Sequence, residues 1–362
     1  MGRHYLDHAS TSPARPEVVE AMLPWLSGEH AADPGRVHTE GRMARAAIEH
    51  AREQVGALVG ARPREVVFTS GATEAINAVS FGAPGPVAVA PVEHSAVRDS
   101  AARHDVVELA VDSLGRIDLA SVDEALDRGA RIVHCQWGNH EVGTLQPVRE
   151  VVERCRARDV LVHVDAAQAV GRVAVDFRAL EADLLSISAH KFGGAKGIGA
   201  LIVRRGLRLD PFIVGGEQER ARRAGMENVP AIVGFGAAAA LPIVDTASLV
   251  PRLAAAACAV DGVVRYGDAE PDKALPHILC VGVDGVEAEA VLLGLDQAGI
   301  AAHSGSSCSS ESLEPSPVLQ AMGVEAERSL RLSVGWSTTE EDVDAFADAF
   351  PRVVARLRSL GG

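Results

Sequence analysis

The chain has 362 residues, 47% of them hydrophobic and 23% charged, and a formal net charge of −14 at pH 7. This length exceeds one typical domain, so we expect two domains that share a cleft and bury a large core. The negative charge argues against nucleic acid or an anionic membrane as a partner, because both recruit clustered positive charge.

Between about residue 45 and residue 205, short apolar runs typical of strands alternate with helical patterns. This alternation predicts a parallel sheet with helices on both faces. The runs are continuously apolar, as expected for strands that are buried on both faces. The expected strands are 65–69, 86–90, 131–136, 160–164, 184–187 and 199–203, and the expected helices are 72–81, 95–103 and 148–158.

The C-terminal part of the sequence predicts a second, smaller α/β domain. Its expected elements are a helix over 249–260, a strand over 278–283, a helix over 287–297, a strand over 330–334 and a long final helix. That last helix starts with a capping-box sequence, Thr338-Thr339-Glu340-Glu341. The segment Tyr5-Leu6-Asp7 is too short to form a domain and is expected to dock at the cleft. We therefore predict a large domain over 13–244 and a small domain formed by 1–12 and 245–362.

The cysteines and the start of the chain indicate a protein of the reducing cytoplasm. The five cysteines are scattered and form no CxxC pair, which argues against a disulfide framework or a zinc site, and we expect no metal. The chain enters a strand-like segment without an apolar signal region, and no apolar run is long enough to cross a membrane. We expect Cys135, Cys155, Cys258 and Cys280 to be inert core residues, since each lies in an apolar strand or helix pattern. Cys308 differs, because its neighbours are nearly all serines.

Four polar clusters each follow a predicted strand directly. In open parallel sheets ligands collect beyond the carboxyl ends of the strands, so one crevice could hold all four clusters. The clusters are Ser70-Gly71-Ala72-Thr73, Asn139-His140-Glu141, Asp165-Ala166-Ala167-Gln168 and Ser188-Ala189-His190-Lys191.

Each cluster has a functional and an ordinary interpretation. The glycine turn before Thr73 opens a helix whose free N–H groups suit a phosphate, although it could be a plain helix cap. Asp165 ends an apolar strand and needs a cationic partner, either a protonated pyridine nitrogen or an arginine. Lys191 follows a buried-looking strand that could lower its amine pKa and make it nucleophilic toward an aldehyde, although most lysines at strand ends are surface residues.

Six motifs in this order resemble the cysteine desulfurases that depend on pyridoxal 5'-phosphate (PLP), within aminotransferase class V. The likeness covers nearly the whole chain and is greatest to the subgroup with a serine-rich loop around a reactive cysteine. The motifs are GATEAIN (Gly71–Asn77), VEHSAV (Val92–Val97), HVDAAQAVG (His163–Gly171), SAHKFGGAKGIGAL (Ser188–Leu201), SGSSCSSESLEPSPVLQAMG (Ser304–Gly323) and SLRLSVG (Ser329–Gly335).

The resemblance implies the aspartate aminotransferase fold (type I) and one PLP per site. In that fold a large domain with a mainly parallel seven-stranded sheet joins a smaller α/β domain, which here would carry the reactive-cysteine loop at about 303–314. Lys191 would hold PLP as a Schiff base, and Asp165 would keep the pyridine nitrogen protonated. Gln168 would form a hydrogen bond with the ring hydroxyl. The phosphate would be held by Gly71, Ala72, Thr73, Ser188 and His190.

For catalysis, the resemblance implies that the freed amine of Lys191 abstracts the α-proton of L-cysteine and that Cys308 attacks the substrate sulfur. His94 would stack on the ring and take part in proton transfer. Arg331 would grip the substrate carboxylate, which a planar guanidinium does well. Asn139 and Asp33 fall where the family contacts its substrate.

The sequence departs from the family pattern at four places. His140 replaces an asparagine that contacts the ring hydroxyl, and Asp33 replaces an asparagine that helps to orient the substrate. Met226 replaces a threonine that reaches the phosphate of the neighbouring subunit. The first motif, usually Ala-Thr-Thr, is Ser10-Thr11-Ser12.

Taken together, these residues favour a cysteine desulfurase that converts L-cysteine to L-alanine and passes the sulfur, as a persulfide on Cys308, to an acceptor protein. The departures at Asp33 and His140 leave open a C–S lyase that eliminates from a larger cysteine conjugate. A third hypothesis is a non-catalytic scaffold for sulfur assembly. The resemblance also implies a homodimer, because the region around Arg223–Asn228 completes the neighbour's site in this family.

Overall fold

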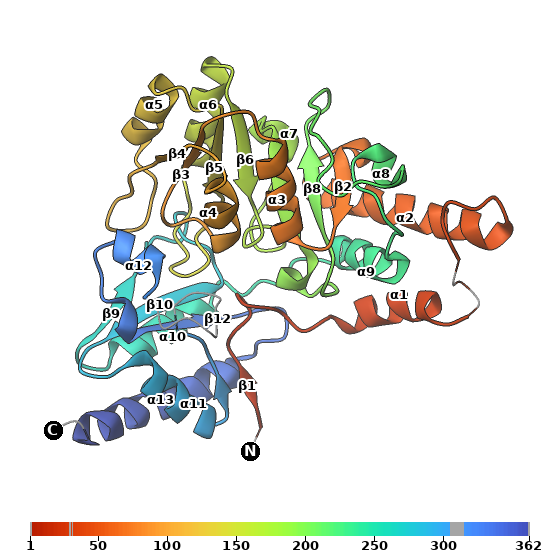
Figure 1. Ribbon diagram of the computed structural model, residues 1–362. Helices are drawn as coiled ribbons and strands as arrows, with labels where there is room; N and C mark the ends of the chain where they lie inside the picture. Colours follow the sequence, from red (N-terminus) through yellow and green to blue (C-terminus); the bar gives the residue numbers. More distant parts are fainter. Residues whose placement is uncertain (1, 29, 31, 305–314, 361–362) are drawn as a thin grey trace.

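The computed structural model describes residues 2–28, 30, 32–304 and 315–360, which form a large and a small domain (Figure 1). Within this part, seven strands form the central sheet in the order β2-β8-β7-β6-β5-β3-β4. The strands are β2 (Val66–Thr69), β3 (Val87–Val89), β4 (Val106–Glu108), β5 (Ile132–Gln136), β6 (Leu161–Asp165), β7 (Leu184–Ser188) and β8 (Gly199–Val203). Strands β3 to β7 are parallel, whereas β8 runs antiparallel to both of its neighbours. The prediction of a mainly parallel sheet is confirmed.

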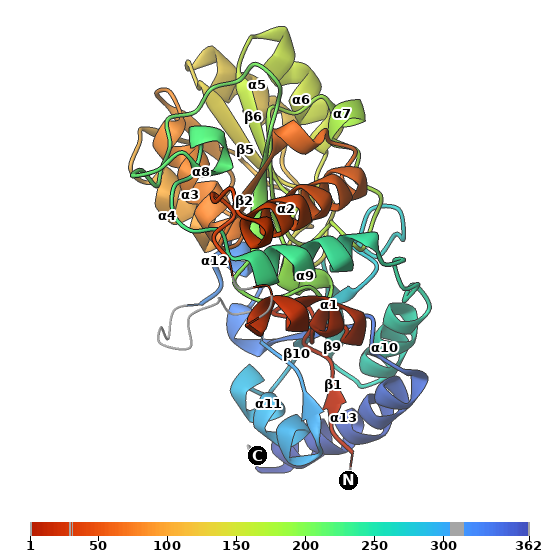
Figure 2. The same ribbon diagram turned by 90° about the vertical axis from the view of Figure 1, so that its right-hand side faces the viewer.

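Helices cover both faces of this sheet, which explains the continuous apolar runs of its strands. Helices α3 and α4 pack on one face, and α2, α6 and α9 pack on the other. Figure 2 shows α9 between α2 and α1. The helices of the large domain are α1 (Pro16–Leu26), α2 (Thr39–Leu58), α3 (Ala72–Gly82), α4 (Ser95–Ala101), α5 (Leu119–Asp127), α6 (Val148–Ala157), α7 (Phe177–Leu180), α8 (Gln218–Ala221) and α9 (Val229–Ala240).

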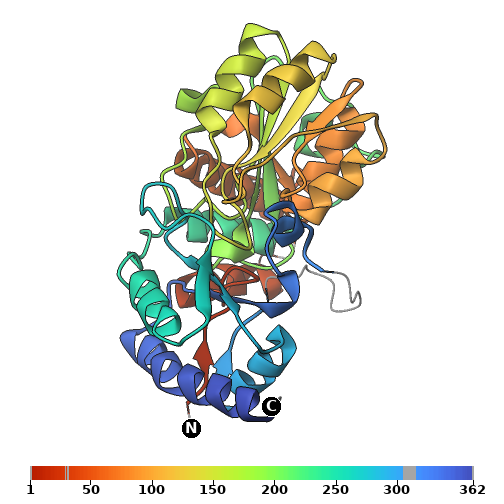
Figure 3. The ribbon, with the colours of Figure 1, turned by 90° about the vertical axis from the view of Figure 1, so that its left-hand side faces the viewer.

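The small domain is built on an antiparallel sheet of order β12-β10-β9 within the described residues. Its strands are β9 (Val263–Tyr266), β10 (Ile278–Val283) and β12 (Ser329–Ser333), and its helices are α10 (Leu249–Cys258), α11 (Ala288–Gln297), α12 (Pro317–Ala321) and α13 (Glu340–Leu360). Figure 3 shows α10, α11 and α13 around this sheet, on the far side from the large domain. The expected order of helices and strands is therefore observed.

The N-terminal segment crosses from the small domain to the cleft, as expected. Strand β1 (His4–Tyr5) pairs with β11 (Ile300–Ala301). Leu6 is fully buried in the small-domain core. A few residues later, Ser12 donates its backbone N–H to the carbonyl of His190 in the large domain. The exact division into 13–244 and 1–12 plus 245–362 stays a prediction.

Two local predictions were wrong. Helix α13 does begin with a capping box, but it pairs Thr339 with Asp342 rather than Thr338 with Glu341. Thr339 is the residue immediately before the helix, so the third helical position is Asp342. Cys258 is exposed, not buried, because it lies one residue beyond Ala257, the last buried position of α10.

Cys135, Cys155 and Cys280 are buried as predicted, and burial raises the pKa of all three thiols, that of Cys155 to about 12. No helix in the described part of the chain has both the length and the apolarity of a membrane crossing.

Candidate active site

One cavity of about 470 Å³ lies at the carboxyl ends of β5, β6 and β7. Members of all four predicted polar clusters line it, so the sheet brings them together as expected. Its walls are Thr11, Ser70, Gly71, Ala72, Thr73, Ile76, His94, Gln136, Gly138, His140, Asp165, Ala167, Gln168, Ser188, His190, Lys191, Lys196 and Gly197.

One end of the cavity is built like an anion site. Gly71 is the cap of α3, so the first backbone N–H groups of that helix are not used inside it. These groups and the positive end of the helix favour a phosphate. The start of β8 passes directly beneath the turn, where a Cβ on Gly199 would lie 2.7 Å from the Gly71 Cα. Only a glycine fits at position 199, and this close approach fixes the turn.

Lys191 reaches into the same cavity from the short 3₁₀ helix that follows β7. Its Nζ donates to the backbone carbonyl of Ala9, at 2.7 Å, and to that of Ser10, at 3.1 Å. Both carbonyls belong to the N-terminal segment. The small domain's first residues therefore position the amine of the large domain.

Asp165 lies at the end of β6 and is 8% exposed. Its Oδ1 accepts from the Ala167 N–H at 3.0 Å and from the Ser186 hydroxyl at 3.3 Å. Burial raises the pKa of this carboxyl above its usual value. Among the described residues no arginine or other cation forms an ion pair with it, so the structure favours the first of the two partners considered, a cationic ligand group.

His94 and His140 face each other edge to face, with ring centroids 5.0 Å apart. The His94 Nδ1 accepts from the Ala96 N–H and thereby caps α4. Burial, reinforced by His140 and Lys191, lowers the pKa of His94 to about 3. The imidazole of His94 is therefore neutral at physiological pH, and because Nδ1 is the acceptor, its proton lies on Nε2.

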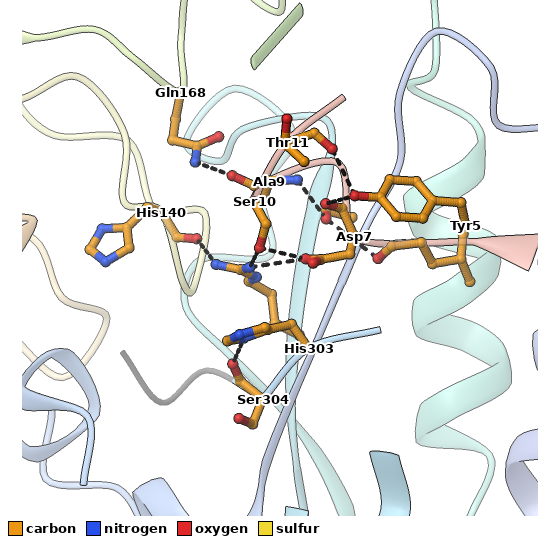
Figure 4. A network of polar contacts seen from close by, with 12 residues as sticks. Tyr5, Asp7, Ala9, Ser10, Thr11, His140, Gln168, His303 and Ser304 are labelled. Carbon is orange, nitrogen blue, oxygen red and sulfur yellow. Dashed lines mark hydrogen bonds and ion pairs between the residues drawn. The ribbon is translucent and has the colours of Figure 1, made fainter. Parts of the chain in front are cut away.

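Arg331 lies on β12, and its charge is already engaged. Figure 4 shows Asp7, Ser10 and His140, the three residues that accept hydrogen bonds from its guanidinium. It donates to the His140 carbonyl at 2.9 Å, to Asp7 Oδ1 at 3.0 Å and to the Ser10 hydroxyl at 2.8 Å. Its Nε is buried and has no partner among the described residues. These contacts use three of the five N–H groups of the guanidinium, so a substrate carboxylate would have to take the Nε–H, take the second Nη1–H or displace Asp7.

Gln168 lines the cavity, but its amide is also held from outside. Its Nε2 donates to the Ala9 carbonyl at 2.8 Å, and its Oε1 lies 3.2 Å from His277 Nε2. The side chain is thus fixed in position, as a residue that presents one group to a ligand ring must be.

Besides Arg331, two predicted residues do not line the cavity, and a third lies outside the described residues. Asn139 is fully buried, and its amide holds its own loop by donating to the Val92 carbonyl and accepting from the N–H groups of Glu141 and Val142. Asp33 lies on the loop between α1 and α2, 3.0 Å from the Arg36 guanidinium. This placement does not support substrate binding by Asn139 or Asp33 within one chain. Cys308 lies outside the described residues.

Sequence reasoning missed several residues of the cavity wall. Lys196 belongs to the Ser188–Leu201 motif, and Gln136 ends β5 just as Asp165 ends β6, so both had a signal. Glu93 does not line the cavity, but it is fully buried and accepts from the N–H of the lining residue Gln136 at 2.6 Å. Burial raises its pKa to about 8.

Comparison with known proteins identifies the family of this chain. The aminotransferase class-V model matches residues 4–346. Cysteine desulfurase IscS 1 of Archaeoglobus fulgidus is 40% identical over 376 residues, covering 98% of each chain. The chain belongs to the cysteine desulfurase family. Among solved structures, a NifS-like protein is 30% identical with a TM-score of 0.90, covering 98% of this chain and 100% of that one. SspA in complex with cysteine is 30% identical with a TM-score of 0.83, and the match covers 93% of this chain and 100% of SspA.

These similarities confirm the resemblance, the fold and the assignment to a PLP-dependent enzyme family. The cavity fits that cofactor, since it combines an anion-binding helix terminus, a buried carboxylate that forms no ion pair within the described residues, and a lysine amine. Within the described residues, no group of His, Cys, Asp or Glu side chains is arranged to hold a metal ion.

Proposed function

We propose that this cysteine desulfurase binds PLP on Lys191, takes the sulfur of L-cysteine onto Cys308 and releases L-alanine. The observation that carries this proposal is the arrangement of Lys191, Asp165 and the Gly71–Thr73 turn around one cavity. An amine, a carboxylate and an anion site match the aldehyde, the pyridine nitrogen and the phosphate of the cofactor. When bound, PLP supplies an electron sink for the substrate's α-carbon.

The chain's own residues divide the remaining work. The Lys191 amine takes the α-proton, and neutral His94, whose Nδ1 is used in capping α4, lines the same cavity with an Nε2–H that can donate a hydrogen bond. The thiolate of Cys308 attacks the substrate sulfur, forming an S–S bond as the C–S bond breaks. The carbon retains that electron pair and takes up a proton, which gives alanine.

The rim of the site is where this chain differs from its family pattern, and it supports a second candidate. His140 lines the cavity next to His94, in a position expected to hold asparagine. An imidazole in place of the expected amide changes the contacts that a ligand would make here, which suits an enzyme that eliminates from a larger cysteine conjugate. Such an enzyme would release pyruvate and ammonia instead of alanine.

Product analysis separates these functions. With L-cysteine and a reductant, we expect alanine and sulfide from the natural chain, and a loss of both from Cys308→Ala. Cys258→Ala is the matched control, because Cys258 is an exposed thiol outside the cavity. Undiminished alanine release by Cys308→Ala would refute the persulfide step, and pyruvate as the main product would establish elimination.

We also propose a cytoplasmic homodimer that hands its sulfur to an acceptor protein. Support comes from the family and from exposed apolar side chains near the expected subunit contact: Val214 is 76% exposed and Met226 is 64% exposed. Sedimentation of the purified protein would test the dimer, and the substitution Met226→Glu should weaken it.

A further inference from the structure

Four polar residues form a row inside the central sheet, on the face that α3 and α4 cover. In parallel strands, paired positions share a face, and so do positions two residues apart. His134 of β5 pairs with His163 of β6. Asp165, two residues along β6, pairs with Ser186 of β7. The sheet itself therefore aligns all four side chains.

These side chains form a continuous hydrogen-bonded chain. The two histidines approach through their Nδ1 atoms at 2.8 Å, and His163 Nε2 lies 3.1 Å from the Ser186 hydroxyl. That hydroxyl lies 3.3 Å from Asp165 Oδ1. His134, His163 and Ser186 are fully buried.

The chemistry of each group fixes the direction of the chain. An ionised carboxylate only accepts, so Ser186 donates to Asp165 and accepts from the Nε2–H of His163. His163 then has a lone pair on Nδ1, which accepts from the Nδ1–H of His134. This leaves a lone pair on His134 Nε2, the atom that has no partner among the described residues.

Both imidazoles are neutral in this arrangement. Burial lowers the pKa of His134 to about 3 and that of His163 well below its usual value. A charged imidazole would donate from both nitrogens and could not pass the chain on. Every donor in the row is consequently directed toward Asp165.

We propose that His134, His163 and Ser186 are positioning residues that act through Asp165, holding its carboxylate ionised and oriented toward a cationic ring nitrogen in the cavity. This inference rests on the proposed function, because it assumes that Asp165 pairs with the cofactor. None of the three side chains lines the cavity, so they act on the cofactor through hydrogen bonds alone.

The test is the dissociation constant for PLP, measured by titrating apoprotein and following visible absorbance. Ser186→Ala should weaken PLP binding roughly 10- to 100-fold, the range of one hydrogen bond to a charged group. His163→Leu should have a smaller effect and His134→Leu the smallest. Ser186→Cys, which keeps a weak donor, should fall between Ser186→Ala and the natural chain.

A control separates positioning from packing. Ser100→Ala removes another buried hydroxyl on the same side of the sheet, 2.7 Å from Ser80, and should leave PLP affinity within about twofold. If packing alone mattered, the larger histidine truncations would weaken PLP binding most. That order, or a Ser186→Ala affinity equal to that of Ser100→Ala, overturns the inference. If the histidine variants do not fold, the two serine variants decide.

Two further measurements keep the inference distinct from the proposed function. Asp165→Asn that binds PLP normally would sink the proposed role of Asp165 itself. Weak PLP binding by Asp165→Asn together with normal binding by Ser186→Ala would refute only the positioning role of His134, His163 and Ser186. Histidine ¹⁵N chemical shifts of the holoenzyme should place the proton of His163 on Nε2 and that of His134 on Nδ1, and the opposite tautomers contradict the assigned direction.

Discussion

Replacing Arg52 with methionine should destabilise the large domain more than any surface substitution. Arg52 of α2 is 1% exposed and binds Glu219 through two hydrogen bonds, at 2.7 and 2.8 Å. Glu219 Oε2 also accepts from the Phe68 N–H of β2, the strand that leads into the phosphate turn. The ion pair further restrains Glu219, Arg220 and Ala221, whose φ values of 49°, 60° and 59° are unfavourable for residues with a side chain.

The magnitude follows from the charge that is left behind. Removing one partner of a buried pair leaves an uncompensated charge, which costs about 3–5 kcal/mol. Equilibrium unfolding in urea measures it, with Arg352→Met as the control. Arg352 forms an ion pair with Asp348, but that pair is exposed, so its loss should leave the free energy of unfolding nearly unchanged. A loss below about 1 kcal/mol for Arg52→Met would refute the reasoning.

Three more predictions follow from single residues. Folding raises the pKa of Glu93 from 4.5 to about 8, so between these two values the native state binds more protons than the unfolded state. Stability should therefore fall as the pH rises through this range. Thermal melts should show this decline for the natural chain and a flatter profile for Glu93→Gln. Gly199→Ala should weaken PLP binding and lower the melting temperature, because the new Cβ would clash with Gly71. Gly28→Ala is the control, since open space surrounds Gly28 and neither quantity should change. Equal melting temperatures of the two variants would contradict this prediction. Exposed Cys258 should react with a thiol reagent in the native protein while Cys135 and Cys280 react only after unfolding, as peptide mass spectrometry would show.

The sequence predicted the site because strand ends are local signals that the sheet collects at one edge. Asp165, Lys191 and Ser188 each follow an apolar run, and parallel pairing carries them to one cavity. However, the position of a residue after an apolar run does not predict which hydrogen bonds its side chain makes within the loop. Asn139 lies in the right cluster, but its amide is used by its own loop.

Long-range pairing explains what was not foreseen. His134 and His163 read as interruptions of apolar strands, and only the register of β5 against β6 makes them a pair. The carbonyls of Ala9 and Ser10 meet Lys191 across more than 180 residues of sequence, which no local pattern encodes. The prediction that Cys258 is buried was wrong for a local reason. At the end of α10 a difference of one residue decides whether a side chain faces the core, as Ala257 does, or the solvent.

The central claim concerns which amine carries the cofactor, and the chain has only three lysines, Lys191, Lys196 and Lys273. Two of them, Lys191 and Lys196, line the cavity. Borohydride reduction of the PLP-loaded protein, followed by peptide mass spectrometry, identifies the attached residue directly. We predict the cofactor mass on the peptide that contains Lys191, with the modification at that residue and its loss in Lys191→Ala. Modification at Lys196 instead, or a Lys191→Ala protein that still retains a reducible cofactor and turns over L-cysteine, would contradict the account.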